Sequence, residues 1–143
     1  KVMGIREQRE HIFKLLLRVE FNPKEDMPEQ LALFFEDTEE EMAEPDQVCI
    51  TDKYEKIMEK LSEIDGLLNE KAEKWTTQRM GKVELTILRL AVYEILFDET
   101  VPVSVAINEA VELAKKFGQE NAKAFVNGII AKFAQQEPLK EQV

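Results

Sequence analysis

Hydrophobic positions along this chain recur at helical spacing, and no segment alternates apolar and polar residues as a half-buried strand would. The densest apolar run is residues 83–97, VELTILRLAVYEILF, in which eleven of fifteen residues are apolar. A helix that is apolar on nearly every side must be buried, so this run predicts the central helix of a helical bundle. Polar positions in and beside it form one narrow stripe that we expect to face solvent or a ligand: Lys82, Thr86, Arg89 and Tyr93.

Two amphipathic helices are expected after this central run. The first covers residues 105–117, with Ser104 as its predicted N-cap and Gly118 as a left-handed stop. The second carries an apolar stripe at helical spacing over residues 122–133. Because glycine inside a helix costs about 1 kcal/mol against alanine, Gly128 in this second helix predicts a close approach to another helix.

The N-terminal half of the chain predicts three further helices. They cover residues 5–21, residues 28–41, and a third segment that starts at Asp46 or Thr51 and ends at Asn69, with Pro45 in the loop before it. The segment EKWTTQRMG that follows is expected to be a short helix or a turn. Together these elements predict an all-α, single-domain bundle of about seven helices.

Length and composition agree with one soluble globular domain over residues 1–143. Apolar residues make up 44% of the chain and charged residues 34%. No apolar run approaches the roughly 20 residues of a membrane span, and the first residues lack the apolar core of a signal peptide. Cys49 is the single cysteine, so an intrachain disulfide and a cysteine-based metal site are excluded. We expect a cytoplasmic protein.

The net charge of −10 disfavours a general nucleic-acid binder, but the charge is unevenly distributed. Residues 1–18 carry a net charge of +3, residues 20–70 a net charge of −13, and residues 71–143 balance at zero. The acidic excess therefore belongs to the second quarter of the chain and its neighbours. Both ends remain available to phosphate groups.

No arrangement of residues predicts an active site, a cofactor or a metal. His11 is the single histidine, and no serine or cysteine lies at helical spacing from it for nucleophilic catalysis. A di-metal helical bundle would need a second histidine, and five scattered glycines form no phosphate-binding loop. We therefore expect a protein that is not an enzyme.

Several side chains are candidates for contacts with phosphate or bases, each with a structural alternative. Arg6 and Arg9 lie on one flank of the first helix, where the pattern alone favours a solvated face. Trp75 and Phe125 are possible stacking platforms for bases, although periodicity favours helix packing for both. Arg89, on the polar stripe, is either a ligand contact or the buried ion-pair partner of a glutamate such as Glu109.

The C-terminal motifs bring a specific resemblance. The chain contains RLAVYE at residues 89–94, VP at 101–102, VAINEAVELAKKFG at 105–118 and FVNG at 125–128. This succession closely resembles the NusB family of transcription antitermination factors, and weaker agreement extends over most of the chain.

The resemblance implies a non-catalytic adaptor that binds single-stranded boxA RNA as part of an RNA polymerase antitermination complex. Arg6 and Arg9 match the family's arginine-rich first helix, with Ile5 at a position where another arginine is common, so RNA affinity is expected to be lower. Asn121 and Phe125 match the RNA-facing end of the last helix. Lys123 beside them is a natural phosphate contact, and Arg89 completes the RNA-binding candidates.

The same resemblance implies a protein partner, the small-subunit ribosomal protein that doubles as NusE. Glu84 matches a family position on the partner face, and Leu88 lies one turn further along the same helix. Together with this partner, boxA binding would promote read-through in ribosomal RNA operons. Two alternatives stay open: the NusB-like domain of an RNA methyltransferase, and a helical protein–protein module without RNA binding. The pattern also leaves a homodimer open.

Overall fold

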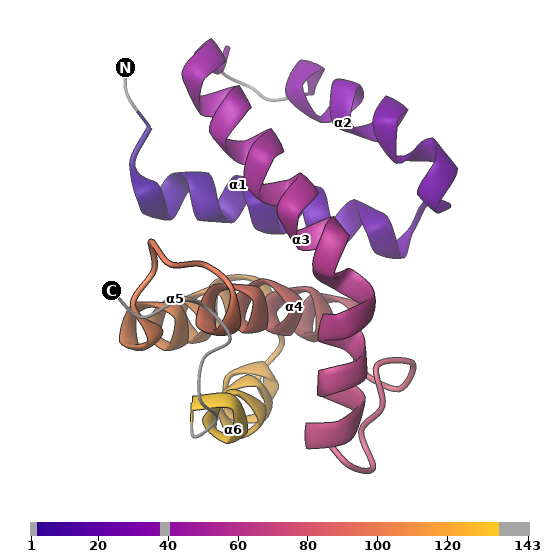
Figure 1. Cartoon of the computed structure of the whole chain (residues 1–143), viewed down its shortest axis with the longest axis vertical. Coiled ribbons are helices and arrows are strands. Elements are labelled where there is room, and N and C mark those ends of the chain that lie inside the picture. Colours follow the sequence, from indigo (N-terminus) through magenta and orange to yellow (C-terminus); the bar gives the residue numbers. More distant parts are fainter. Residues whose placement is uncertain (1–2, 38–40, 135–143) are drawn as a thin grey trace. The chain divides into compact units, whose positions relative to one another are not determined.

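The computed structural model describes residues 3–37 and 41–134, and all regular elements in these ranges are helical. The prediction of an all-α fold is confirmed, with six α-helices in the described residues instead of about seven. The difference lies in residues 73–81, which form turns. In chain order (Figure 1), the elements are α1 (Ile5–Leu17), the 3₁₀ helices η1 (Arg18–Glu20) and η2 (Lys24–Asp26), α2 (Met27–Glu36), α3 (Glu44–Lys71), α4 (Lys82–Leu96), α5 (Val103–Phe117) and α6 (Ala122–Ala134).

Contacts within the chain define two units, Lys1–Met58 and Glu59–Val143. In the first unit, α2 is shorter than predicted, and residues 38–40 of the expected range lie outside the described residues. Helix α3 begins at Glu44, earlier than expected, so Pro45 is in its first turn and not in a loop. Proline is tolerated there because the first helical N–H groups have no partner within the helix.

Polar side chains tie the elements of the first unit together. Gln8 Nε2 on α1 donates to Asp46 Oδ1 in the first turn of α3 at 3.0 Å. Arg18 forms an ion pair with Asp37 at 3.3 Å, and its guanidinium carbon lies 5.3 Å from the ring centroid of Phe34. Arg18 therefore stabilises this unit through the face of an aromatic ring as well as through its charge.

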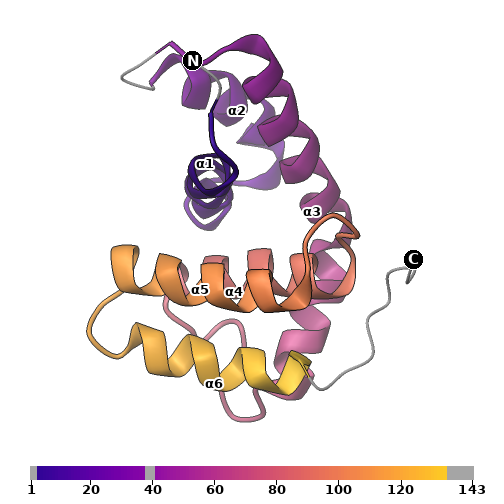
Figure 2. The ribbon, with the colours of Figure 1, turned by 90° about the vertical axis from the view of Figure 1, so that its left-hand side faces the viewer.

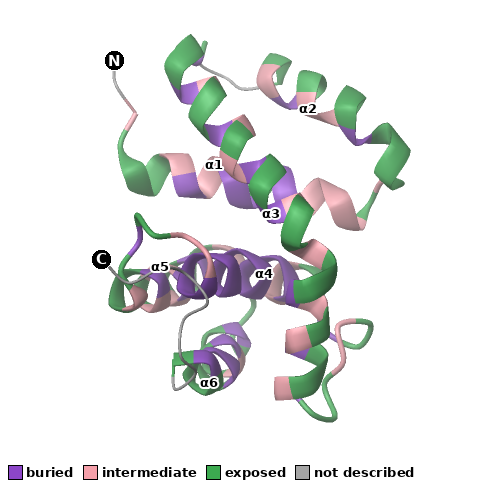
Figure 3. Ribbon diagram, viewed as in Figure 1, coloured by how far each residue is buried: buried purple, intermediate pink, exposed green. Residues whose placement is uncertain are grey.

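Helix α4 is the buried centre of the second unit, as its apolar run predicts. All twelve residues from Leu85 to Leu96 are buried, a continuous band in Figure 3. Helix α4 packs against both α5 and α6, and these two also pack against each other (Figure 2). In the part of the chain that the structure describes, no helix is long and apolar enough to cross a membrane.

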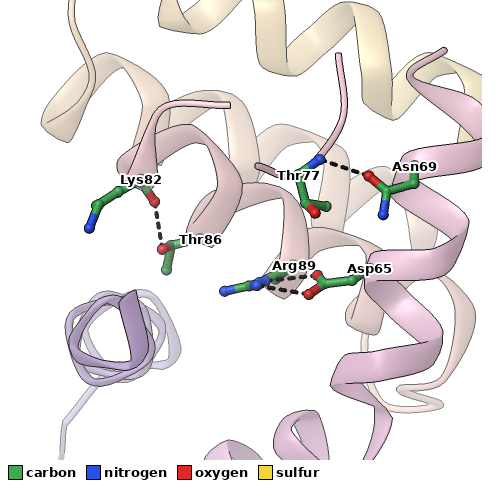
Figure 4. Close-up of polar contacts among 6 residues, drawn as sticks. All are labelled: Asp65, Asn69, Thr77, Lys82, Thr86 and Arg89. Atoms are coloured by element: carbon green, nitrogen blue, oxygen red, sulfur yellow. Dashed lines mark hydrogen bonds and ion pairs between the residues drawn. The ribbon is translucent and has the colours of Figure 1, made fainter. Parts of the chain in front are cut away.

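The polar stripe on α4 does not face solvent along its length. Lys82 is exposed, but Thr86, Arg89 and Tyr93 are buried. The Thr86 hydroxyl donates to the Lys82 carbonyl at 2.7 Å, a bond to the preceding turn that satisfies a buried side chain locally (Figure 4). The buried Thr86 hydroxyl is therefore satisfied within its own helix.

Two predictions about the ends of α5 were wrong. The helix starts at Val103 with Pro102 as N-cap, so Ser104 lies inside the first turn. Gly118 has φ −88° and ψ 168°, an extended conformation and not a left-handed one. Glycine is needed there for space, because a Cβ would overlap the Ala122 Cβ and lie 2.7 Å from the Ala114 carbonyl oxygen.

Gly128 is not at a close helix approach. It is exposed on α6, and a Cβ placed there meets no atom of the described residues within 4 Å. Alanine would fit without strain, so we expect Gly128→Ala to raise the free energy of unfolding by about 1 kcal/mol. Urea unfolding measures the change, and Gly118→Ala, where the Cβ would overlap its neighbour, should be destabilising. A destabilised Gly128→Ala would contradict the open space seen at this position.

Candidate nucleic-acid interface

The two candidate arginines on α1 differ in exposure. Arg6 lies in the first turn of the helix and is exposed, next to Ile5, which is 75% exposed. Arg9, three residues later, is only 4% exposed and both arginines have contacts within the protein. Arg9 precedes Ile12 by three residues and Phe13 by four, so it lies on their face of the helix, and the interpretation of a solvated face was wrong for this residue. Of these two candidates, Arg6 is the one that offers its side chain to solvent.

Arg89 forms an ion pair, which was one of the two interpretations left open. Its Nε and Nη2 atoms donate to the two carboxylate oxygens of Asp65 on α3, each at 2.8 Å (Figure 4). The side chain of Arg89 is 9% exposed and that of Asp65 is 25% exposed. Two parallel charge-assisted bonds hold the guanidinium plane in one orientation. Asp65 was not predicted as a partner because nothing distinguishes it among the acidic residues of its segment.

The partner-face candidates on α4 have structural roles of their own. Glu84 lies in the first turn, and its carboxylate occupies the space where a Cβ at Gly81 would stand. A negative charge at this end of a helix is stabilised by the unpaired N–H groups. Leu88 is 0% exposed, so it belongs to the core that supports this helix and offers no exposed side chain.

The candidates on and before α6 are near one another in sequence but differ in environment. Asn121 and Lys123 are exposed, and Phe125 is half-buried. The Phe125 N–H donates to the Asn121 carbonyl at 3.2 Å, which places these two residues one helical turn apart. Lys123, two residues after Asn121, points away from that side of the helix.

Phe125 contacts Trp75, the other aromatic residue that was considered as a stacking platform for bases. Their ring centroids lie 5.8 Å apart and their planes cross at 83°. The predicted packing role is correct for both, yet Trp75 keeps 42% of its surface exposed. The guanidinium carbon of Arg79 lies 5.4 Å from the Trp75 ring centroid. Arg79 was not predicted as a site residue. Its position four residues after Trp75 was the feature of the sequence that could have indicated this contact.

His11 and Cys49, the single histidine and the single cysteine of the chain, differ in environment. The His11 ring contacts the Phe34 ring edge-on at 6.0 Å, and burial, reinforced by Lys14, lowers the pKa of His11 below its usual value. Cys49 is exposed. No group of three His, Cys, Asp or Glu side chains in residues 3–37 and 41–134 is arranged to hold a metal ion. The candidates on α1 and at the start of α6 are cationic, amide and aromatic side chains, the types that contact phosphate and bases.

The sequence and the all-helical fold of this chain are similar to those of one protein family. The NusB family model matches residues 6–135. The Lachnoclostridium phytofermentans transcription antitermination protein NusB is 50% identical over 130 residues, covering 91% of this chain and 98% of that protein. Its Agathobacter rectalis counterpart is 49% identical over 130 residues, covering 88% and 95%. The solved structure of T. maritima NusB superimposes with a TM-score of 0.84 at 35% identity, covering 96% and 94%. This chain belongs to the NusB family.

Proposed function

We propose that this chain is a cytoplasmic, non-catalytic transcription antitermination factor. In this proposal it binds boxA RNA together with the ribosomal protein NusE and promotes read-through in ribosomal RNA operons. The observation that carries the proposal is the similarity to the Lachnoclostridium phytofermentans protein, which is named a transcription antitermination protein. The two sequences are 50% identical over 130 residues, and this chain covers 98% of that protein. The identity to a protein of that name also favours this function over the alternative of an RNA methyltransferase domain.

Electrostatics explains why the proposed function includes a protein partner. The chain carries a net charge of −10, which repels an anionic polymer at long range. A basic protein docked on acidic surface neutralises that charge and adds phosphate contacts of its own. The basic residues of the chain would then act locally, and Arg6, Asn121, Lys123 and Phe125 are the proposed RNA contacts. Arg9 would have to leave its present buried environment to reach phosphate.

The RNA contact of Arg6 can be tested through salt dependence. On single-stranded RNA each lost phosphate contact reduces the slope of log K against log salt by about 0.7. We expect Arg6→Ala to reduce the slope by this amount for labelled boxA RNA, and Ile5→Arg to increase it. Lys56→Ala, which removes an exposed cation from the acidic part of α3, is the matched control. Equal slopes for Arg6→Ala and the parent would exclude Arg6 as a phosphate contact.

The partner contact of Glu84 is tested by the coupling between RNA and partner binding. If the partner tightens RNA binding, RNA must tighten partner binding by the same factor. We expect Glu84→Lys to abolish the partner's enhancement of RNA affinity while leaving binding to RNA alone unchanged. Titrations of boxA RNA at fixed salt, with and without the partner, measure both effects.

Because Glu84 also stabilises the start of α4, thermal melts should accompany these titrations. Loss of that interaction alone costs about 0.5 kcal/mol. Glu99→Lys reverses an exposed charge in the loop after α4 and is the control for net charge. Full enhancement in Glu84→Lys would remove this residue from the partner face. Absence of RNA binding in the parent, with and without partner, would instead identify a protein–protein module.

A further inference from the structure

We propose that Trp75 and Arg79, in the connection between α3 and α4, form a platform on which an unpaired base of the RNA stacks, with Phe125 holding the indole ring in place. The proposal rests on the proposed function and assigns it an additional contact. Trp75 and Arg79 both belong to the second unit, as does Phe125.

The exposed indole is the first observation. Tryptophan is the largest apolar side chain, and leaving 42% of this one in water forgoes part of its burial energy. The perpendicular contact with Phe125, at 5.8 Å between ring centroids, restrains the ring without covering it completely. Arg79 lies 5.4 Å from the same ring and adds a planar cation that itself stacks on bases.

The backbone that carries the platform is held by hydrogen bonds. The Trp75 N–H donates to the Ala72 carbonyl at 3.0 Å, and the Thr77 N–H donates to the Asn69 side chain at 2.7 Å. The second of these bonds is drawn in Figure 4. Lys132 Nζ on α6 donates to the carbonyl of Lys71, the last residue of α3, at 2.9 Å. A ligand would therefore meet a largely ordered surface, which lowers the entropic cost of binding.

Charge around the platform favours an anionic polymer. Residues 71–82 and 122–134, the segments that meet where Trp75 contacts Phe125, contain six basic side chains and one acidic side chain. Their net charge of +5 contrasts with −15 for the rest of the chain. Gly128, one turn after Phe125, leaves open space on α6 that a side chain would fill. An acidic peptide would use this charge but would leave the exposed indole without a stacking partner.

Fluorescence tests the proposal on the parent chain. Trp75 is the only tryptophan, so its emission reports on this platform alone. Stacking of a base is expected to quench the emission when single-stranded boxA RNA is added at low salt. Heparin and poly-glutamate, which are anionic polymers without bases, should leave it nearly unchanged. Equal quenching by these polymers would overturn the proposal, because the platform would then respond to charge and not to bases.

Variants supply the second measurement. In titrations followed by a label on the RNA, Trp75→Ala should weaken binding by about tenfold, whereas Trp75→Phe should retain most of the affinity. Circular dichroism melts check that each variant is folded. The proposed platform would be wrong if a folded Trp75→Ala variant binds RNA as tightly as the parent and RNA does not quench the parent's fluorescence. The proposed function would then remain intact. Failure of the parent to bind RNA, with and without the partner, would overturn both.

Discussion

Replacing Leu88 by alanine should lower the free energy of unfolding by about 2–5 kcal/mol. Leu88 is 0% exposed and lies in the middle of α4, where its neighbours on both sides are also buried. Removing three side-chain carbons there loses the free energy gained by transferring them from water into the core. It also leaves a cavity that the surrounding side chains, which are closely packed, fill only in part. Urea unfolding followed by circular dichroism measures the difference.

The matched control is Leu33→Ala, which makes the same chemical change at a position of α2 that is 36% exposed. Because Leu33 is already partly hydrated, its loss should cost less than about 1 kcal/mol. A Leu88→Ala variant within about half a kcal/mol of the parent would mean that α4 is not the central helix of its unit.

Replacing Arg89 by methionine should destabilise the protein by about 3 kcal/mol. The change leaves the Asp65 carboxylate, which is 25% exposed, without the two bonds of 2.8 Å that satisfy it. The double variant Asp65→Asn with Arg89→Met removes both charges, so neither is left unpaired. Its loss in the free energy of unfolding should therefore be smaller than the sum of the losses in the two single variants. The double-mutant cycle isolates the interaction between the two side chains.

The exposed pair between Lys115 and Glu112 provides the comparison. Its side chains are 49% and 48% exposed and 3.4 Å apart, so Lys115→Met should cost less than about 0.5 kcal/mol. The same variants also decide between the two roles considered for Arg89. If Arg89→Met is as stable as the parent but loses affinity for boxA RNA, then Arg89 acts on RNA and its pairing with Asp65 contributes little.

Residue order alone determined which segments are helical and which helix is central. Periodicity reports how a segment divides its surface between core and water, and the run at 83–97 leaves almost no polar face. The helix ends were less accurately predicted: Ser104 and Pro45 both lie inside first turns. Such ends depend on where the neighbouring elements force the chain to turn, which a local pattern does not contain.

The candidate site was only partly predictable for the same reason. Residue type and family motif were enough to identify Arg6, Lys123 and Phe125 as candidate RNA contacts. The sequence could not show that Trp75 and Phe125, fifty residues apart, would meet while the indole stays exposed, or that Arg79 would lie beside it. Such contacts depend on the packing of helices that are distant in the chain.

The sequence by itself thus determined an all-helical protein of the NusB family, with a buried central helix and basic residues concentrated outside its acidic second quarter. The tertiary structure decided which carboxylate Arg89 meets, that Arg9 is buried, and that Gly118 rather than Gly128 lies where a side chain would collide. The physical reason is the range of the interactions. Helical periodicity depends on residues that are close together in the sequence. Ion pairs, ring contacts and steric limits between helices form only when the chain has folded.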